Sequence, residues 1–254
     1  MLRHVIATMV LLALNVGVAP AGEIRVLAAV AVKDPLDRFA QAFTRATGHK
    51  VEIGYSLTGP ILADIKAGKP VDAIVLPEQG KVALTGLGLL DKPVPVSASL
   101  AGVGVRADAP MPDVSTLDAF RALLRAAPSI SYTDPKSGGA FGQYFAKALA
   151  EIGMADEVAR KAVLVAGSHL VVVAVAKGDA AIGVTFKSAI VTTPGLKFAG
   201  TLPRPLEDRE PFTAGVLKNA KEPDIAHAFV ASLTAPEAAA VWTDLGFAAG
   251  PASH

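Results

Sequence analysis

The strongest limit on the fold of this sequence is a unit in which an apolar strand passes through a short polar or glycine-rich turn into a helix. The unit occurs four times. Strands joined through helices form mainly parallel sheets with right-handed crossovers, so the pattern predicts an α/β fold. Folds of this kind bind ligands at the carboxyl ends of their strands. The predicted turns follow strands at residues 24–29, 51–55, 129–132 and 163–165.

Each predicted turn suits a negatively charged ligand. The first turn of a helix has backbone N–H groups without an intrahelical partner, and the helix dipole is positive at that end. The sequence contains no His or Cys cluster at metal-ligand spacing, no G-x-S-x-G elbow, no P-loop and no dinucleotide fingerprint. We therefore predict binding of a small anion, with no catalytic residue, no metal site and no cofactor.

Residues 1–21 have the pattern of a secretory signal peptide. Arg3 and His4 give a basic start, an apolar run follows, and Ala19-Pro20-Ala21 offers a small-x-small cleavage signal. The apolar run is short for a membrane span, so we expect cleavage, no stable membrane insertion afterwards, and a periplasmic protein. The chain has no cysteine, which excludes disulfides, thiolate chemistry and lipid attachment through a cysteine.

The charges of the chain nearly balance, with 24 basic and 23 acidic residues. Nucleic-acid binding needs a basic face, so this composition argues against it, and an anion site must be formed locally. The length allows two modest lobes. Pro- and Gly-rich stretches at residues 100–112 and 203–211 are the predicted crossings between them. The mixed charges of residues 204–210 are typical of a solvated connector.

Five segments carry a family resemblance, namely residues 26–34, 67–73, 134–135, 181–184 and 229–247. Taken together in this order, they resemble the periplasmic molybdate-binding proteins of ABC importers. The resemblance implies a two-lobe type II periplasmic binding fold, in which each lobe is a mainly parallel sheet flanked by helices and two strands form a hinge. It implies a small anionic ligand and an ABC transporter permease as partners, and we expect a monomer. After the signal peptide, the predicted domains are 22–103 with 206–254 as lobe 1, and 104–205 as lobe 2.

The same resemblance supplies candidate ligand contacts. Ala31 stands where the family has a Ser and offers only its N–H, whereas Thr58 keeps a hydroxyl. Lys33, His169 and Lys187 are cationic candidates, and carboxylates often recruit such groups. A small organic carboxylate is therefore as suitable a ligand as a molybdate-like oxyanion. The predicted contacts are Ala31, Val32, Lys33, Thr58, Gly59, Ser137, Gly138, Gly139, Ala140, Ser168, His169, Phe186 and Lys187.

Each candidate also has a structural alternative. Thr58 and Ser168 could be helix caps, and the glycines could serve only a turn. Lys33 and Lys187 could be solvated charges at the rim, and His169 could be a structural side chain.

Two other functions stay open at this point. An exported sensor or scavenger would present the same ligand to a receptor instead of a transporter. A periplasmic hydrolase could use Asp134 and Ser137 with His169, although nothing in the sequence brings these residues together.

Overall fold

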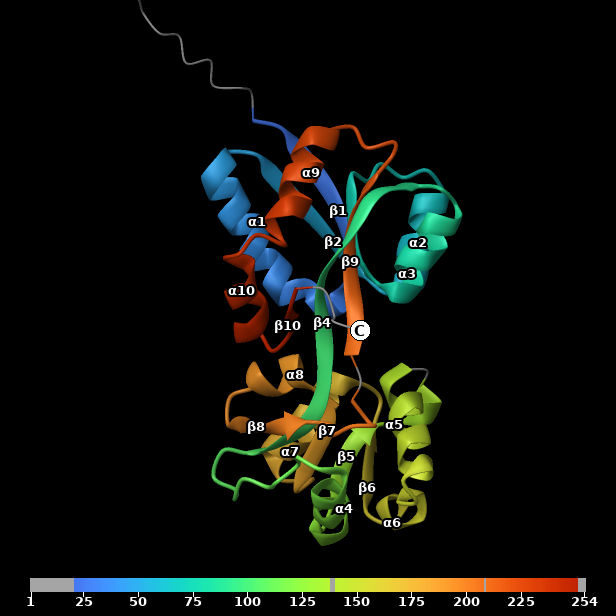
Figure 1. Ribbon diagram of the computed structural model, residues 1–254, viewed down its shortest axis with the longest axis vertical. Coiled ribbons are helices and arrows are strands. Elements are labelled where there is room, and N and C mark those ends of the chain that lie inside the picture. The colour runs from blue at the N-terminus through green and yellow to red at the C-terminus, as the bar shows by residue number, and fades with distance from the viewer. Residues whose placement is uncertain (1–20, 138–139, 208, 251–254) are drawn as a thin grey trace, which may run out of the picture.

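The computed structural model describes residues 21–137, 140–207 and 209–250, so all but the last residue of the predicted signal peptide lies outside the described part. Its strands form one hydrogen-bonded path in the order β2-β1-β3-β9-β4-β7-β5-β6, with β8 and β10 pairing onto β4 (Figure 1). The strands are β1 Glu23–Ala29, β2 Lys50–Ser56, β3 Ala73–Pro77, β4 Leu90–Arg106, β5 Ile130–Thr133, β6 Ala162–Val165, β7 Ile182–Phe186, β8 Leu196–Thr201, β9 Arg209–Leu217 and β10 Ala248–Ala249.

The predicted α/β class is confirmed, with one difference in strand direction. β1 runs parallel to β2 and β3, and β5 runs parallel to β6 and β7. Between these groups, β9 is antiparallel to β3 and β4, and β4 is antiparallel to β7 and β8. The parallel strands therefore form the outer parts of the path, and the strands between them run in opposite directions.

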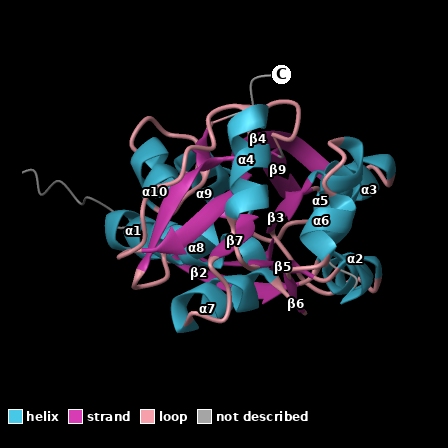
Figure 2. Ribbon diagram, turned by 90° about the horizontal axis from the view of Figure 1, so that it is seen from below, coloured by secondary structure: helices cyan, strands magenta, loops and turns pink. Residues whose placement is uncertain are grey.

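Helices flank this sheet (Figure 2). In α1, Leu36, Phe39 and Phe43 lie on one face and are buried, and Gly48 ends the helix in the left-handed conformation at φ 78°. The helices are α1 Lys33–Thr47, α2 Thr58–Lys66, α3 Glu78–Gly86, α4 Leu117–Ala126, α5 Ala140–Glu151, α6 Ala155–Ala159, α7 Ser168–Lys177, α8 Lys187–Val191, α9 Pro223–Ser232 and α10 Ala238–Asp244, with 3-10 turns η1 Val30–Val32 and η2 Pro135–Ser137.

The buried apolar side chains form two large clusters. The first core combines residues 24–96 with residues 212–247, so the end of the chain packs against its beginning. The ring centroids of Phe39 on α1 and Trp242 on α10 are 5.2 Å apart in this core. The second core contains residues 101–206. The division into lobes at residues 103 and 205 stays a prediction, since two cores alone do not show that the halves move.

Strand β4 connects the two cores. It pairs with β9 from Leu90 to Leu100, and with β7 and β8 from Ala101 onward. It contains Pro93 and Pro95, and shifts of register beside these two residues let the strand continue. Farther along β4, the close approach of β8 requires a glycine at position 102, because a Cβ there would lie 2.3 Å from the carbonyl oxygen of Gly200.

Within the described residues, no helix combines the length and the apolar character that a membrane crossing requires.

Candidate functional site

A pocket of about 600 Å3, which we call the central pocket, lies between the two cores at the crossing strands. Strands β1, β2, β3, β5 and β7 end at it, as the strand–turn–helix pattern predicts. Its lining comes from both sides of the crossing: Ala29, Val30, Ala31, Ser56, Leu57, Thr58, Pro77, Gln79, Thr133, Phe141, Tyr144, Ala166, Gly167, Ser168, Phe186, Arg209, Glu210, Pro211 and Phe212.

Three helices of nine or ten residues begin at the wall of the central pocket. The N-cap residues of α2, α3 and α7 are Leu57, Pro77 and Gly167, and all three line the pocket. None of them makes a side-chain capping hydrogen bond. By contrast, Thr116 caps α4, which begins elsewhere, by accepting from the N–H of Ala119 at 3.1 Å. The first-turn N–H groups at the pocket are therefore not taken up by caps.

The hydroxyl residues Thr58 and Ser168 are the first residues of α2 and α7, not their caps. This position brings both residues to the wall of the central pocket. The methyl group of Thr58 packs against Gly80 of α3, where a Cβ would lie only 3.1 Å from Thr58 Cγ2. The capping role that the sequence left open for these two residues is therefore wrong.

Two further predicted contacts, Ala31 and Phe186, also line the central pocket. His169 lines a neighbouring pocket of about 640 Å3, the side pocket, which shares Ala31, Ser168 and Phe186 with the central one. The imidazole of His169 folds back over Gly167, where a Cβ would be 3.2 Å from its Nδ1 atom. The structure thus brings residues from three of the four predicted turns together.

Other predicted contacts lie elsewhere. Val32 is fully buried in the first core. Lys33 binds Asp37 and lies 5.0 Å from the ring centroid of Tyr55, while Lys187 lies 5.4 Å from that of Phe198. These three residues, like the exposed Gly59 and Ser137, are absent from the lining of the central and side pockets in the described structure.

The third predicted turn is described only in part. Ser137 Oγ donates to the carbonyl oxygen of Asp134 at 2.7 Å, so the hydroxyl serves its own turn. Gly138 and Gly139 lie outside the described residues, and Ala140 begins α5.

Sequence reasoning identified Phe186 but missed the other aromatic residues in the wall of the central pocket. Phe141 and Phe186 have ring centroids 4.9 Å apart. Tyr144 donates its hydroxyl to the carbonyl oxygen of Leu206 at 2.8 Å, which ties α5 to the segment before β9. The helical spacing of Phe141 and Tyr144 was visible in the sequence, but it is equally typical of residues that face a core.

Arg209 and Glu210 were also missed, because the mixed charges around them are typical of a solvated connector. Both residues line the central pocket as well, a position that the connector interpretation did not include. Arg209 and Glu210 form the start of β9 and pair with β4, and this pairing is visible only in the structure.

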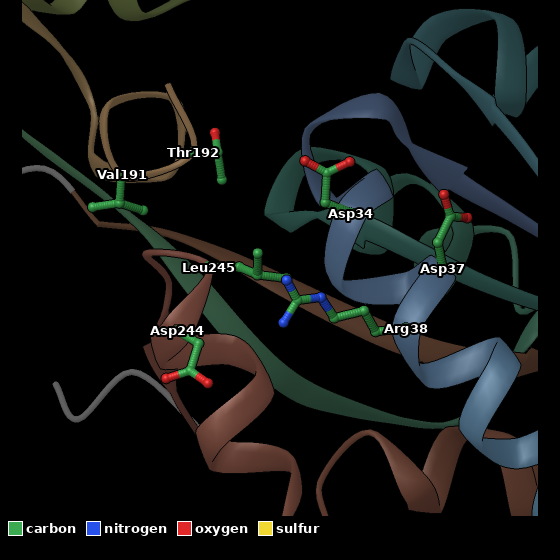
Figure 3. A pocket seen from close by; sticks show the side chains of 7 residues that line it. All are labelled: Asp34, Asp37, Arg38, Val191, Thr192, Asp244 and Leu245. Carbon is green, nitrogen blue, oxygen red and sulfur yellow. The ribbon is translucent and has the colours of Figure 1, made fainter. Parts of the chain in front are cut away.

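A third, outer pocket opens between α1, α8 and α10. Asp34, Asp37 and Arg38 of α1 line it together with Thr192 and Asp244, and Figure 3 shows Arg38 extending from α1 toward Leu245. Three carboxylates against one guanidinium make this pocket a poor place for an anion. No group of three or more His, Cys, Asp or Glu residues in the described ranges is placed to hold a metal ion.

Asp37 forms a small polar cluster at the edge of the outer pocket. Its carboxylate accepts from the hydroxyl of Tyr55 at 2.6 Å and from Lys33. Partial burial opposes ionisation of Asp37, but these two donors outweigh it and hold its pKa below the usual value. Burial and the neighbouring Asp37 raise the pKa of Tyr55, so its hydroxyl stays protonated and continues to donate. Lys33 is thereby held outside the central pocket.

Comparison with known proteins gives a family match over most of the chain. The sequence model of a family described as bacterial extracellular solute-binding protein matches residues 24–248. A protein from Pseudomonas sp named aconitate isomerase is 25% identical over 243 residues, which are 92% of this chain and 90% of that protein.

Similar solved structures support the same fold. A substrate-binding domain from Clostridium difficile, assigned to a molybdenum ABC transporter, has a TM-score of 0.80 and 18% identity over 91% of this chain and 100% of that one. The periplasmic molybdate-binding protein of Azotobacter vinelandii has a TM-score of 0.67 and 20% identity over 90% of this chain and 100% of that one.

Proposed function

This chain belongs to the bacterial extracellular solute-binding proteins, and from this premise we propose that it captures a small anion in the periplasm for an ABC importer. The observation that carries the proposal is the convergence of α2, α3 and α7, none of them capped by a side chain, on the central pocket. Each helix end carries roughly half a positive elementary charge. Several such ends at one place favour an anion.

Capture would use the two cores as lobes and the crossing strands β4 and β9 as the hinge. An anion that contacts both lobes favours the closed form, since it binds that form better than the open one. Closure also removes water and strengthens the hydrogen bonds to the ligand. A monomer in the closed form would then dock on the permease.

The ligand that suits the pocket is a small organic carboxylate. A volume of about 600 Å3 lies in the range of pockets that bind small organic ligands. The aromatic rings of Phe141 and Phe186 offer a surface for a carbon body. The relative named for aconitate, a tricarboxylate, supports this choice. The structural neighbours named for molybdate keep the oxyanion as the rival ligand.

Calorimetry and thermal unfolding with molybdate, tungstate, sulfate and a panel of carboxylates test the proposal. A ligand at 100 times its Kd stabilises the folded protein by about 2.7 kcal/mol, which is a readily measured rise in Tm. If no anion in either group raises Tm or gives a heat of binding, the proposed function is wrong.

Replacement of the two hydroxyls at the helix starts gives the first variant prediction. Thr58→Ala combined with Ser168→Ala should weaken anion binding by at least about tenfold, because each change removes a donor to a charged group. Calorimetry measures the change. Ser137→Ala is the matched control, since this hydroxyl is occupied within its own turn and should leave Kd unchanged.

A second candidate function, isomerisation of an unsaturated carboxylate, is supported by the aconitate isomerase relative. Moving the double bond requires one carbon to lose a proton and another to gain one, with no other reactant. His169 lines the side pocket, which adjoins the central pocket, and its imidazole could carry that proton. Our primary proposal is binding without turnover, because the family whose model matches residues 24–248 is described as one of solute-binding proteins.

Proton NMR of cis- and trans-aconitate incubated with the protein separates the two functions. Binding without turnover predicts that each isomer persists at the uncatalysed rate. Conversion that depends on protein concentration, and that His169→Asn abolishes, would show that the chain is an enzyme.

A further inference from the structure

Arg209 occupies a distinctive position in the central pocket. It is the first residue of β9 and pairs with Leu100 of β4, where the chain passes from the second core to the first. Among the described residues of the pocket lining, Arg209 is the only one with a cationic side chain. That side chain is 40% exposed, so it can reach a ligand.

Glu207 holds the guanidinium of Arg209 in place. Arg209 Nε donates to Glu207 Oε1 at 2.7 Å, and Nη2 lies 2.6 Å from the same oxygen. The Nε of Arg204 approaches the other oxygen, Oε2, at 3.4 Å. A guanidinium has five N–H donors arranged along two edges. Since Glu207 takes the Nε side, the Nη1–Nη2 edge of Arg209 can bind a second carboxylate.

The rest of the pocket offers a different kind of contact. The starts of α2, α3 and α7 supply neutral N–H groups, and Phe141 and Phe186 supply apolar surface. A ligand that uses all three features needs more than one anionic group and a carbon body between them. The planar fork of Arg209 matches a carboxylate through two parallel hydrogen bonds.

We propose that Arg209 binds one carboxylate of a di- or tricarboxylate ligand, while the helix starts bind another. Glu207 is then a positioning residue, because it touches the guanidinium and not the ligand. This inference rests on the proposed function of the central pocket and specifies which side chain selects the ligand. It also places a ligand contact on a crossing strand, where ligand binding and hinge movement can be coupled directly.

Arg204 provides a matched control, since it also pairs with Glu207 but is 91% exposed and outside the lining of the central pocket. Arg209→Gln and Arg204→Gln each remove one positive charge and one partner of Glu207. Calorimetry of the wild type and both variants uses trans-aconitate, propane-1,2,3-tricarboxylate and molybdate as probes. Thermal unfolding without ligand verifies that the variants fold.

We expect Arg209→Gln to weaken tricarboxylate binding by at least about tenfold, and Arg204→Gln to change it by less than about twofold. Arg209→Lys should restore only part of the affinity, because an ammonium keeps the charge without the fork. If Arg209→Gln leaves the Kd for tricarboxylate at the wild-type value, this inference is wrong and the proposed function still holds. Equal losses in both variants, or binding of molybdate alone, would also overturn it. A wild type that binds no anion would overturn both proposals.

Discussion

Thr58 and Ser168 show that the place of a hydroxyl in its helix decides what it can bind. Each stands one residue after the N-cap, at the first position of its helix and on the pocket wall. Thr116 stands one position earlier, at the N-cap of α4, and its hydroxyl bonds to the helix itself. From sequence, the three residues look alike, because each is a small hydroxyl residue before an apolar helix.

Asp37 gives a prediction at the same scale. Asp37→Asn should lower the free energy of unfolding by about 0.5–1 kcal/mol at pH 7, a value reduced for partial exposure, because the charged acceptor of Tyr55 and Lys33 is lost. The folded pKa of Asp37 lies below its unfolded value, so its contribution is present above pH of about 4 and disappears as the pH falls through the folded pKa. Urea unfolding at pH 7 and pH 3 measures this difference.

Asp118→Asn is the control for that measurement. Asp118 pairs with Arg121 at 3.3 Å, but its side chain is 94% exposed, so the change should leave the unfolding free energy nearly the same at both pH values. If Asp37→Asn were as harmless as Asp118→Asn at pH 7, the Asp37 cluster would not stabilise the fold.

Among the elements, α4 offers a test of helix capping away from the site. Thr116→Ala should lower the free energy of unfolding by about 1 kcal/mol, because the N–H of Ala119 loses its acceptor. Ligand affinity should not change, since α4 does not reach the central pocket. Thermal unfolding and calorimetry on the same sample measure the two effects. A loss of affinity would mean that α4 influences the site through the second core.

Helix α7 shows where prediction of an element from its composition was incomplete. Residues 170–176 are apolar throughout, which predicts a helix buried on every side. In the structure Val171 and Val175 pack onto Gly183 of β7, whereas Leu170 and Val173 are 36% and 38% exposed. The helix covers only one face of the sheet, and its sequence contains no polar stripe that would reveal the outer side.

At the scale of the whole molecule, Gly246 lies where the turn after α10 contacts helix α8. It follows α10 of the first core at φ 85°, and a Cβ there would lie 2.8 Å from the backbone of Ser188 in α8. Gly246→Ala should lower the free energy of unfolding by more than about 2 kcal/mol, since backbone strain and a clash with main-chain atoms add together. Thermal unfolding measures this loss.

Gly48 provides the comparison for Gly246. It has a similar φ of 78° but nothing within 4 Å of a built Cβ, so Gly48→Ala should cost only the strain, about 1 kcal/mol. The difference between the two variants isolates the contact between α8 and the turn after α10. Equal losses would show that Ser188 moves aside without cost.

The sequence by itself determined the α/β class and the strand–turn–helix units, because these depend on local periodicity and on turn residues. The helices after the strands predicted at residues 51–55 and 163–165 are examples, since each begins at its predicted turn. The same local signals placed Thr58 and Ser168 at helix starts, and three of the four predicted turns contribute residues to the pockets between the cores.

Only the tertiary structure decided which of those residues meet and what else joins them. Strand β4 persists through Pro93 and Pro95 because β9 pairs with it there, and the paired residues lie more than a hundred positions apart in the chain. Arg209 faces the pocket because β9 pairs there with β4, while Lys33 is kept out by Asp37 and Tyr55. Contacts of this kind depend on segments far apart in the chain, and no local pattern records them.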